Sequence, residues 1–172
     1  MKKFFTTPFA MLLCMAMATA FTACEPEPEK IDEDEKSLAF LCDGEAIAEG
    51  STHTSSKLDE EYAAMGMTRF VPGIDLVGDT DGKVIVTVKS LNKAMVEICA
   101  FGGCQMTLPY LDYTTSASGE ITANTSIPLD IHYTPTTPGE GHRAEALVTA
   151  YYEGHEEDAV SFTLVMTNAK VE

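Results

Sequence analysis

The second half of the chain alternates apolar and polar residues with a period of two. This period is typical of β-strands that bury one face and expose the other. The clearest run covers residues 127–133, where Ile, Leu, Ile and Tyr occupy every second position. Two further runs, 144–152 and 160–166, flank the Glu-Gly-His segment at 153–155 and predict a β-hairpin near the end of the chain.

Earlier strands are less regular. Residues 84–89 follow the turn sequence Asp-Thr-Asp-Gly at 79–82 and predict a strand, residues 94–100 predict another, and residues 37–46 open the fold. Residues 58–67 fit either a single helical turn or an irregular crossover. Seven or eight short strands without helix-length periodicity favour an all-β fold, a two-sheet antiparallel sandwich.

The N-terminus has the pattern of an export signal: two lysines precede an apolar stretch over residues 4–21. The sequence Phe-Thr-Ala-Cys at 21–24 resembles the lipobox of bacterial lipoproteins, with Phe where Leu is usual. The resemblance implies that residues 1–23 are removed as a signal peptide and that Cys24 carries the lipid that anchors the protein to a membrane. Simple secretion after Ala20 is the alternative.

The chain is strongly acidic, with 27 Asp and Glu against 11 Lys and Arg and a formal net charge of −16. This charge argues against nucleic acid as a partner, because phosphate binding needs clustered cations. Residues 24–37 are rich in Glu, Asp and Pro and predict an extended, disordered tether ahead of a domain over 38–172. An acidic run directly after a lipidated cysteine resembles the surface-export signal of Bacteroidota lipoproteins. It implies an outer-membrane protein at the cell surface, with the periplasmic face as the alternative.

Two segments of the predicted domain resemble the small immunoglobulin-like lipoprotein domains common in Bacteroidota. One is Ile-Cys-Ala-Phe-Gly-Gly-Cys at 98–104, and the other is the strand that ends in His-Tyr-Thr-Pro at 132–135, followed by the final hairpin. The resemblance implies an immunoglobulin-like sandwich at the cell envelope. It does not imply one activity.

Three cysteines remain once Cys14 leaves with the leader and Cys24 is acylated. Cys99 and Cys104 flank Phe-Gly-Gly, whose glycines permit the chain reversal that a disulfide between them needs. A bridge to Cys42 and free thiols are the alternatives. If Cys42 is unpaired, we expect it to be a buried thiol.

The sequence shows no catalytic motif, and its four histidines lack the spacing of metal ligands on a helix. The acidic turn at 79–82 resembles a fragment of a calcium loop, but apolar residues stand where the closing glutamate is required, so we expect a turn and neither metal nor cofactor. Exposed tyrosines are the candidate ligand contacts: Tyr110 and Tyr113 in a Pro-containing loop, and Tyr151, since one of the neighbours Tyr151 and Tyr152 must face outward. Ordinary packing at the rim is the alternative for each.

These features predict a cell-envelope lipoprotein that is not an enzyme but a binding or assembly module, with a glycan or another envelope protein as its partner. Two alternatives remain open. One is a structural subunit of a surface polymer or adhesin, which would exchange strands with its neighbours. The other is a small hydrolytic enzyme.

Overall fold

The computed structural model describes residues 37–137 and 139–169. The predicted signal peptide, the lipidation site at Cys24 and almost all of the predicted acidic tether lie outside these residues. The described part of the chain begins at Ser37, one residue before the first strand.

Eleven strands form two sheets in the described part of the chain. One sheet has six strands in the order β2-β1-β4-β9-β6-β7, all paired antiparallel. Its strands are β1 (Leu38–Cys42), β2 (Glu45–Ala46), β4 (Ile74–Gly78), β6 (Val96–Ala100), β7 (Gly103–Met106) and β9 (Ile127–Tyr133).

The second sheet has five strands in the order β3-β11-β10-β5-β8. Its strands are β3 (Thr52–Ser55), β5 (Gly82–Ser90), β8 (Thr114–Ile121), β10 (Arg143–Tyr152) and β11 (Val160–Thr167). β3 runs parallel to β11, and every other neighbouring pair is antiparallel. The predicted terminal hairpin is therefore present as β10 and β11.

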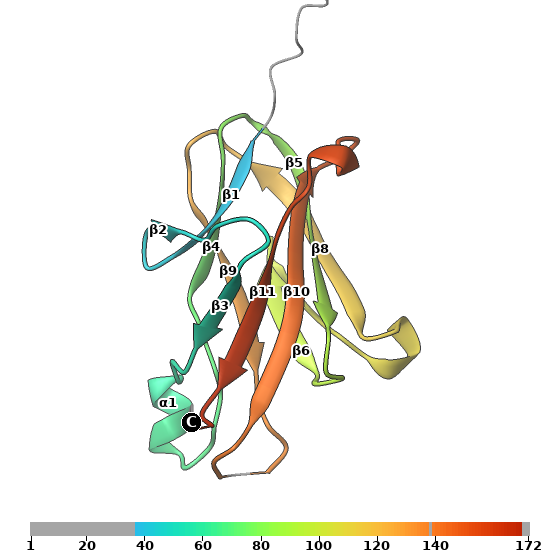
Figure 1. Ribbon diagram of the computed structural model, residues 1–172. Coiled ribbons are helices and arrows are strands. Elements are labelled where there is room, and N and C mark those ends of the chain that lie inside the picture. The colour runs from blue at the N-terminus through green and yellow to red at the C-terminus, as the bar shows by residue number, and fades with distance from the viewer. Residues whose placement is uncertain (1–36, 138, 170–172) are drawn as a thin grey trace, which may run out of the picture. The chain divides into compact units, whose positions relative to one another are not determined.

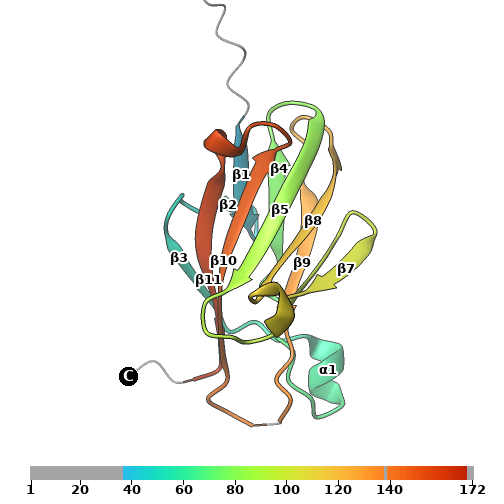
Figure 2. The ribbon, with the colours of Figure 1, turned by 90° about the vertical axis from the view of Figure 1, so that its right-hand side faces the viewer.

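The two sheets stack face to face as a sandwich (Figures 1 and 2). Alternate residues of each strand point into the space between them, as the period of two predicts. Phe40 of one sheet and Phe162 of the other meet across this space with ring centroids 4.9 Å apart. Most other fully buried large side chains also come from the strands: Ile74, Leu76, Val84, Val86, Val88, Ile98, Leu129, Ile131, Leu164 and Met166. The predicted all-β, immunoglobulin-like sandwich is confirmed.

Three short helices lie in the connections between strands: α1 (Glu60–Ala64), η1 (Pro109–Leu111) and η2 (Glu156–Asp158). Helix α1 settles the choice left open for residues 58–67, because one helical turn forms within an irregular crossover. Asp59 begins it by accepting hydrogen bonds from the backbone N–H groups of Glu61 and Tyr62. Figure 1 shows α1 at the opposite end of the sandwich from the β10–β11 connection, which contains η2.

The strand count exceeds the seven or eight that the sequence predicts. The expected opening strand over 37–46 is broken by a tight turn in which Asp43 and Gly44 have φ of 51° and 83°, so two strands replace one. β3 and β7 are only four residues long and largely exposed, so neither shows a strong alternating pattern. β8 was also missed, because its inward positions hold Thr115, Ala117 and Gly119 ahead of Ile121 rather than large apolar residues.

Candidate binding cleft

A cleft of about 550 Å³ opens on the outer face of the five-stranded sheet. We call it the Tyr151 cleft. Its floor comes from β5, β8 and β10, and β7 and the connection between β7 and β8 contribute to its wall. Figure 2 shows β10, β5 and β8 side by side in the sheet. Eight residues line it: Ile85, Thr87, Gln105, Leu111, Thr114, Thr115, Ser116 and Tyr151. The volume is within the range of about 300–1,000 Å³ that is usual for ligand pockets.

Strand register explains why Ile85, Thr87, Thr114, Ser116 and Tyr151 share the outer face, whereas Thr115 occupies an inward position of β8. Tyr151 of β10 lies opposite Ile85 of β5, and Thr87 of β5 lies opposite Ser116 of β8. Successive residues of a strand point to opposite faces, so Tyr152 points inward, where it is 3 % exposed. Its hydroxyl donates to the Thr80 carbonyl at 2.8 Å, and burial raises the pKa of its phenol. Tyr151 therefore lies on the outer face, as the sequence predicts for one of the two tyrosines.

The wall of the cleft is a connection held in an unfavourable backbone conformation. Asp112 and Tyr113 follow η1 with φ of 49° and 54°, in the left-handed region that non-glycine residues rarely occupy. The Tyr113 N–H donates to the Leu108 carbonyl, and the Ser90 N–H donates to the Tyr113 carbonyl, both at 2.9 Å. Lys89 reaches the Asp112 carboxylate at 3.7 Å. Backbone strain that the surroundings maintain in this way is concentrated at functional sites.

None of the eight residues that line the cleft is charged, although the chain as a whole is strongly acidic. Charged residues on this face lie outside the lining, and they include two ion pairs and Glu120 of β8, which lies opposite Lys83. Lys83 pairs with Glu153 at 2.6 Å beyond Ile85, and Lys89 pairs with Asp112 at 3.7 Å beyond Thr87. The lining offers hydroxyls, one carboxamide, a phenol ring and two aliphatic side chains, which suit binding and supply neither a metal ligand set nor a general base.

The structure separates the three tyrosines that the sequence suggests as ligand contacts. Tyr151 lines the cleft, whereas Tyr110 is 79 % exposed on η1 outside the lining, and Tyr113 is half-buried in the strained connection. Leu111 and Gln105 were not predicted as lining residues, because Leu111 reaches the cleft from η1 in the β7–β8 connection and Gln105 reaches it from β7 of the other sheet. The hydroxyl side chains of β5 and β8 were not predicted either, although their alternation along β8 was a usable signal.

A second polar cluster lies on the outer face of the six-stranded sheet. His132 of β9 occupies an outward position yet is only 4 % exposed. Its Nε2 is 2.8 Å from a Glu97 carboxylate oxygen, and its Nδ1 is 3.2 Å from an Asp130 carboxylate oxygen. Arg69, from the crossover, places a guanidinium nitrogen 3.1 Å from His132 Nε2. The same guanidinium is 3.7 Å from the Asp59 carboxylate.

This cluster attaches the β3–β4 crossover to the sheet. Phe70 extends the sheet by exchanging backbone hydrogen bonds with Tyr133, and the two rings stack with centroids 5.9 Å apart. Arg69 also lies over the Tyr62 ring, 4.8 Å from its centroid. These contacts cover His132 with protein, so we assign the cluster a structural role.

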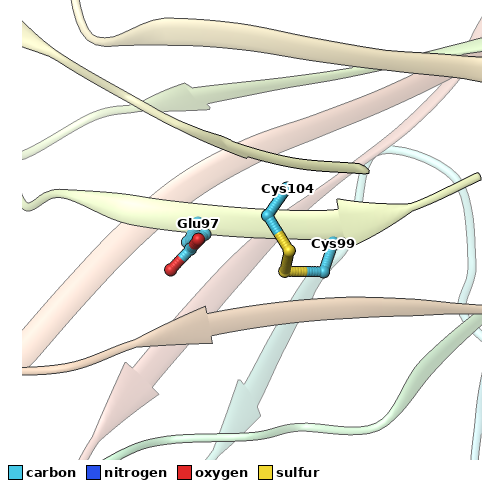
Figure 3. Close-up of side chains that lie close together, drawn as sticks. All are labelled: Glu97, Cys99 and Cys104. Atoms are coloured by element: carbon cyan, nitrogen blue, oxygen red, sulfur yellow. A yellow bond between two sulfur atoms is a disulfide. The ribbon is translucent and has the colours of Figure 1, made fainter. Parts of the chain in front are cut away.

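The predicted disulfide between Cys99 and Cys104 is present (Figure 3). The two residues face each other across the β6–β7 hairpin with Cα atoms 4.0 Å apart. Glu97 lies beside the sulfur atoms, but sulfurs joined to each other are not thiolates, so these three residues do not form a zinc site. Cys42 is a free thiol and half-buried rather than buried; its Sγ is 3.5 Å from the Pro72 carbonyl, and partial burial raises its pKa.

The acidic sequence at 79–82 forms the turn between β4 and β5. Asp79 accepts hydrogen bonds from the Ser37 backbone N–H and hydroxyl, both at 2.9 Å. Asp81 accepts from the Ala123 N–H at 2.7 Å. The carboxylates of this turn are therefore engaged in fixing the start of β1 and the segment after β8.

Comparison with known proteins supports the fold. No protein-family model matches the sequence, and no curated protein matches it. Among solved structures, the N-terminal domain of PorA superposes with a TM-score of 0.51 at 13 % identity, covering 78 % of this chain and 100 % of that domain. PapD-like domain 7 of human CEP192, an ASH/PapD-like domain, gives a TM-score of 0.40 at 11 % identity, covering 92 % of this chain and 100 % of that domain. At these identities the first likeness shows a shared fold alone, and the second carries no argument.

Within residues 37–137 and 139–169, no helix is long and apolar enough to cross a bilayer.

Proposed function

We propose that this protein is a non-catalytic binding module, displayed on the bacterial cell envelope by a lipid on Cys24. The observation that carries the proposal is the Tyr151 cleft, a site of ligand-binding size with an uncharged lining, in which two strained residues, Asp112 and Tyr113, separate the lining residues Leu111 and Thr114 in the chain. Its lining lacks a nucleophile paired with a base, so the site suits binding rather than reaction. The partner is a glycan or an envelope protein, as the sequence suggests.

The two ends of the sandwich differ in a way that fits display on a tether. Ser37, the first described residue, hydrogen-bonds to the β4–β5 turn. Acidic side chains gather on this end, in the β4–β5 and β10–β11 connections: Asp79, Asp81, Glu153, Glu156, Glu157 and Asp158. Among the described residues, Lys83 is the one cation there, and it is paired. Anionic headgroups repel such a surface, which favours a domain that stands away from the lipid.

The opposite end carries exposed apolar side chains. They come from the β3–β4, β5–β6 and β7–β8 connections and from the end of β7: Leu58, Met65, Met67, Leu91, Met95, Met106, Tyr110 and Leu111. A stretched tether of the predicted length reaches on the order of 40 Å. An anchor before Ser37 would therefore leave this end, and the part of the Tyr151 cleft lined by Leu111 and Thr114, accessible to partners.

The binding role can be tested by photo-cross-linking on intact cells. A photoreactive amino acid replaces Thr87 on the cleft floor, and the control variant carries it at Thr163, which faces outward on β11 of the same sheet outside the cleft. We expect an adduct from position 87 and none from position 163. No adduct from position 87, or equal labelling from both positions, would contradict a binding role for the cleft.

Location rests on two separable sequence signals. Cys24→Ala removes the acylated thiol, so we expect the protein to leave the membrane fraction or to remain as an uncleaved precursor. Neutralising Glu25, Glu27 and Glu29 leaves the anchor intact, so this variant should stay in the membrane but resist protease added outside whole cells. If the neutralised variant is cleaved from intact cells as readily as the parent, the acidic tether is only a spacer.

A further inference from the structure

The polar groups in the Tyr151 cleft are free to bind a ligand. Within the described residues, the side chains of Thr87, Gln105, Ser116 and Tyr151 form no hydrogen bond to the protein, and Thr114 alone among the exposed hydroxyls of the lining has one, to the Asp112 carbonyl at 3.3 Å. Hydroxyls and a carboxamide each offer both a donor and an acceptor. A ligand with many neutral hydroxyl groups is complementary to such a surface.

Apolar groups lie among these hydrogen-bonding groups. Tyr151 lies next to Ile85 in the register of β10 and β5, and Leu111 reaches the cleft from η1. An amphipathic ring such as that of tyrosine combines an apolar face with a polar edge. A pyranose has the same two-sided character, since its C–H groups form apolar patches and its hydroxyls lie around the rim.

Charge narrows the ligand class further. The net charge of −16 repels an anionic ligand, and the lining contains no cation to offset the repulsion. A cationic ligand finds no carboxylate in the lining; the Asp112 carboxylate pairs with Lys89, and Glu120 of β8 lies opposite Lys83. A neutral ligand has neither disadvantage.

From this lining we infer that the Tyr151 cleft binds a neutral saccharide. The inference rests on the proposed function, because it names the ligand class of the same site. Tyr151 packs against the apolar face of a sugar ring, with Ile85 and Leu111 beside it. Thr87, Ser116 and Gln105 hydrogen-bond to the sugar hydroxyls.

The test uses the full-length protein purified in a detergent without a sugar headgroup, so that the detergent does not compete. Affinity electrophoresis is run in gels that contain dextran, mannan, soluble starch or xyloglucan as neutral probes, and alginate or polygalacturonate as anionic ones. We expect at least one neutral polysaccharide to slow migration and both anionic ones to leave it unchanged. Isothermal titration with an oligosaccharide of the binding polymer then measures the affinity.

Three variants locate the binding site. Tyr151→Ala should weaken binding about tenfold or more, whereas Tyr151→Phe, which keeps the ring, should weaken it only slightly. Tyr110→Ala is the matched control, because Tyr110 is exposed on η1 but lies outside the lining, and it should bind like the parent. An unchanged thermal midpoint shows that each variant is folded.

Binding of none of the neutral probes, or binding that Tyr151→Ala leaves unchanged, overturns the saccharide inference. The cross-linking result then separates this failure from that of the proposed function. A protein adduct from Thr87 with no saccharide binding means that the cleft binds a protein. No adduct and no saccharide binding remove both proposals.

Discussion

Phe101 in the β6–β7 hairpin contacts Gly119 in β8 of the other sheet. This contact predicts whether a methyl group added at Gly119 lowers or raises the stability of the protein. Phe101 and Gly102 form a two-residue turn with φ of 54° and 81°. Such turns normally contain Asn-Gly, because bulky residues are disfavoured at positive φ. The phenylalanine ring compensates by packing against the backbone at Gly119, which has no side chain to obstruct it.

Replacing Gly119 with Ala should destabilise the protein. The added Cβ would lie 2.7 Å from the Phe101 Cβ, with the ring atoms Cδ1 and Cγ closer still. Forcing an extra methyl into such a contact costs about 1–3 kcal/mol. Alanine also lowers the conformational entropy of the unfolded chain. Because Gly119 has an ordinary backbone conformation, this effect stabilises the folded protein by about 0.4–1 kcal/mol. The net loss is about 1–2 kcal/mol, equivalent to a fall of about 3–8 °C in the melting temperature.

Removing the Phe101 side chain should make Gly119→Ala stabilising instead of destabilising. Phe101→Gly removes the Cβ of residue 101 together with the ring and so vacates the space that the new methyl needs; Gly119→Ala in that background should therefore raise stability by about 0.5 kcal/mol through the entropy effect alone. Urea unfolding of the parent, both single variants and the double variant gives the coupling energy. A destabilisation by Gly119→Ala of equal size in both backgrounds would show that Phe101 does not pack against this backbone in solution.

Three further predictions concern the stability that the disulfide, His132 and Asp79 each contribute. Replacing both Cys99 and Cys104 with Ala should lower the free energy of unfolding by about 2 kcal/mol, because the unfolded chain regains the freedom of a six-residue loop; an unchanged urea midpoint would contradict this. His132→Leu should cost about 1–2 kcal/mol in the same assay, since both ring nitrogens meet carboxylates that would lose their partner, and a loss below about 0.5 kcal/mol would argue against the hydrogen-bond network. Hydrogen bonds, above all from the Ser37 backbone N–H, lower the pKa of Asp79 in the folded protein. The ionised Asp79 carboxylate therefore contributes its full share of stability above the unfolded pKa of about 4, and this share is lost as the pH falls through the lower folded pKa. The Asp79→Asn variant should therefore lose less stability than the parent between pH 6 and pH 3. Equal losses in the two proteins would refute the role of these hydrogen bonds.

Alternation was sufficient to predict the three longest runs, but no strand was predicted at β4, although Ile74 and Leu76 fill its inward positions. The segment predicted at 127–133 has the bounds of β9, and those at 144–152 and 160–166 differ from β10 and β11 by one residue each. The signal failed along β8, where Thr115 and Ala117 face inward because small side chains suffice there. It also failed at β3, whose short parallel pairing with β11 depends on where the chain crosses between sheets.

The cleft could be predicted only in part, because its residues come together through pairing and loop geometry. Tyr151 was predictable from its place in a run next to Tyr152. Leu111 was not, because its position over the sheet depends on two consecutive left-handed residues, Asp112 and Tyr113, which the sequence does not mark with glycine. The disulfide was predictable because Cys99 and Cys104 are joined by a local turn.

Alternation also shows which side of a strand faces outward without showing what covers that side. The outer faces of the two sheets differ for this reason. On the six-stranded sheet the β3–β4 crossover brings Arg69 onto His132, and an outward histidine becomes a buried one. On the five-stranded sheet the β7–β8 connection brings Leu111 to the edge of the face and leaves the hydroxyls of Thr87 and Ser116 without partners in the described part of the protein. Because a binding surface requires groups whose hydrogen bonds are still available, the difference between these two connections places the candidate site on the second face.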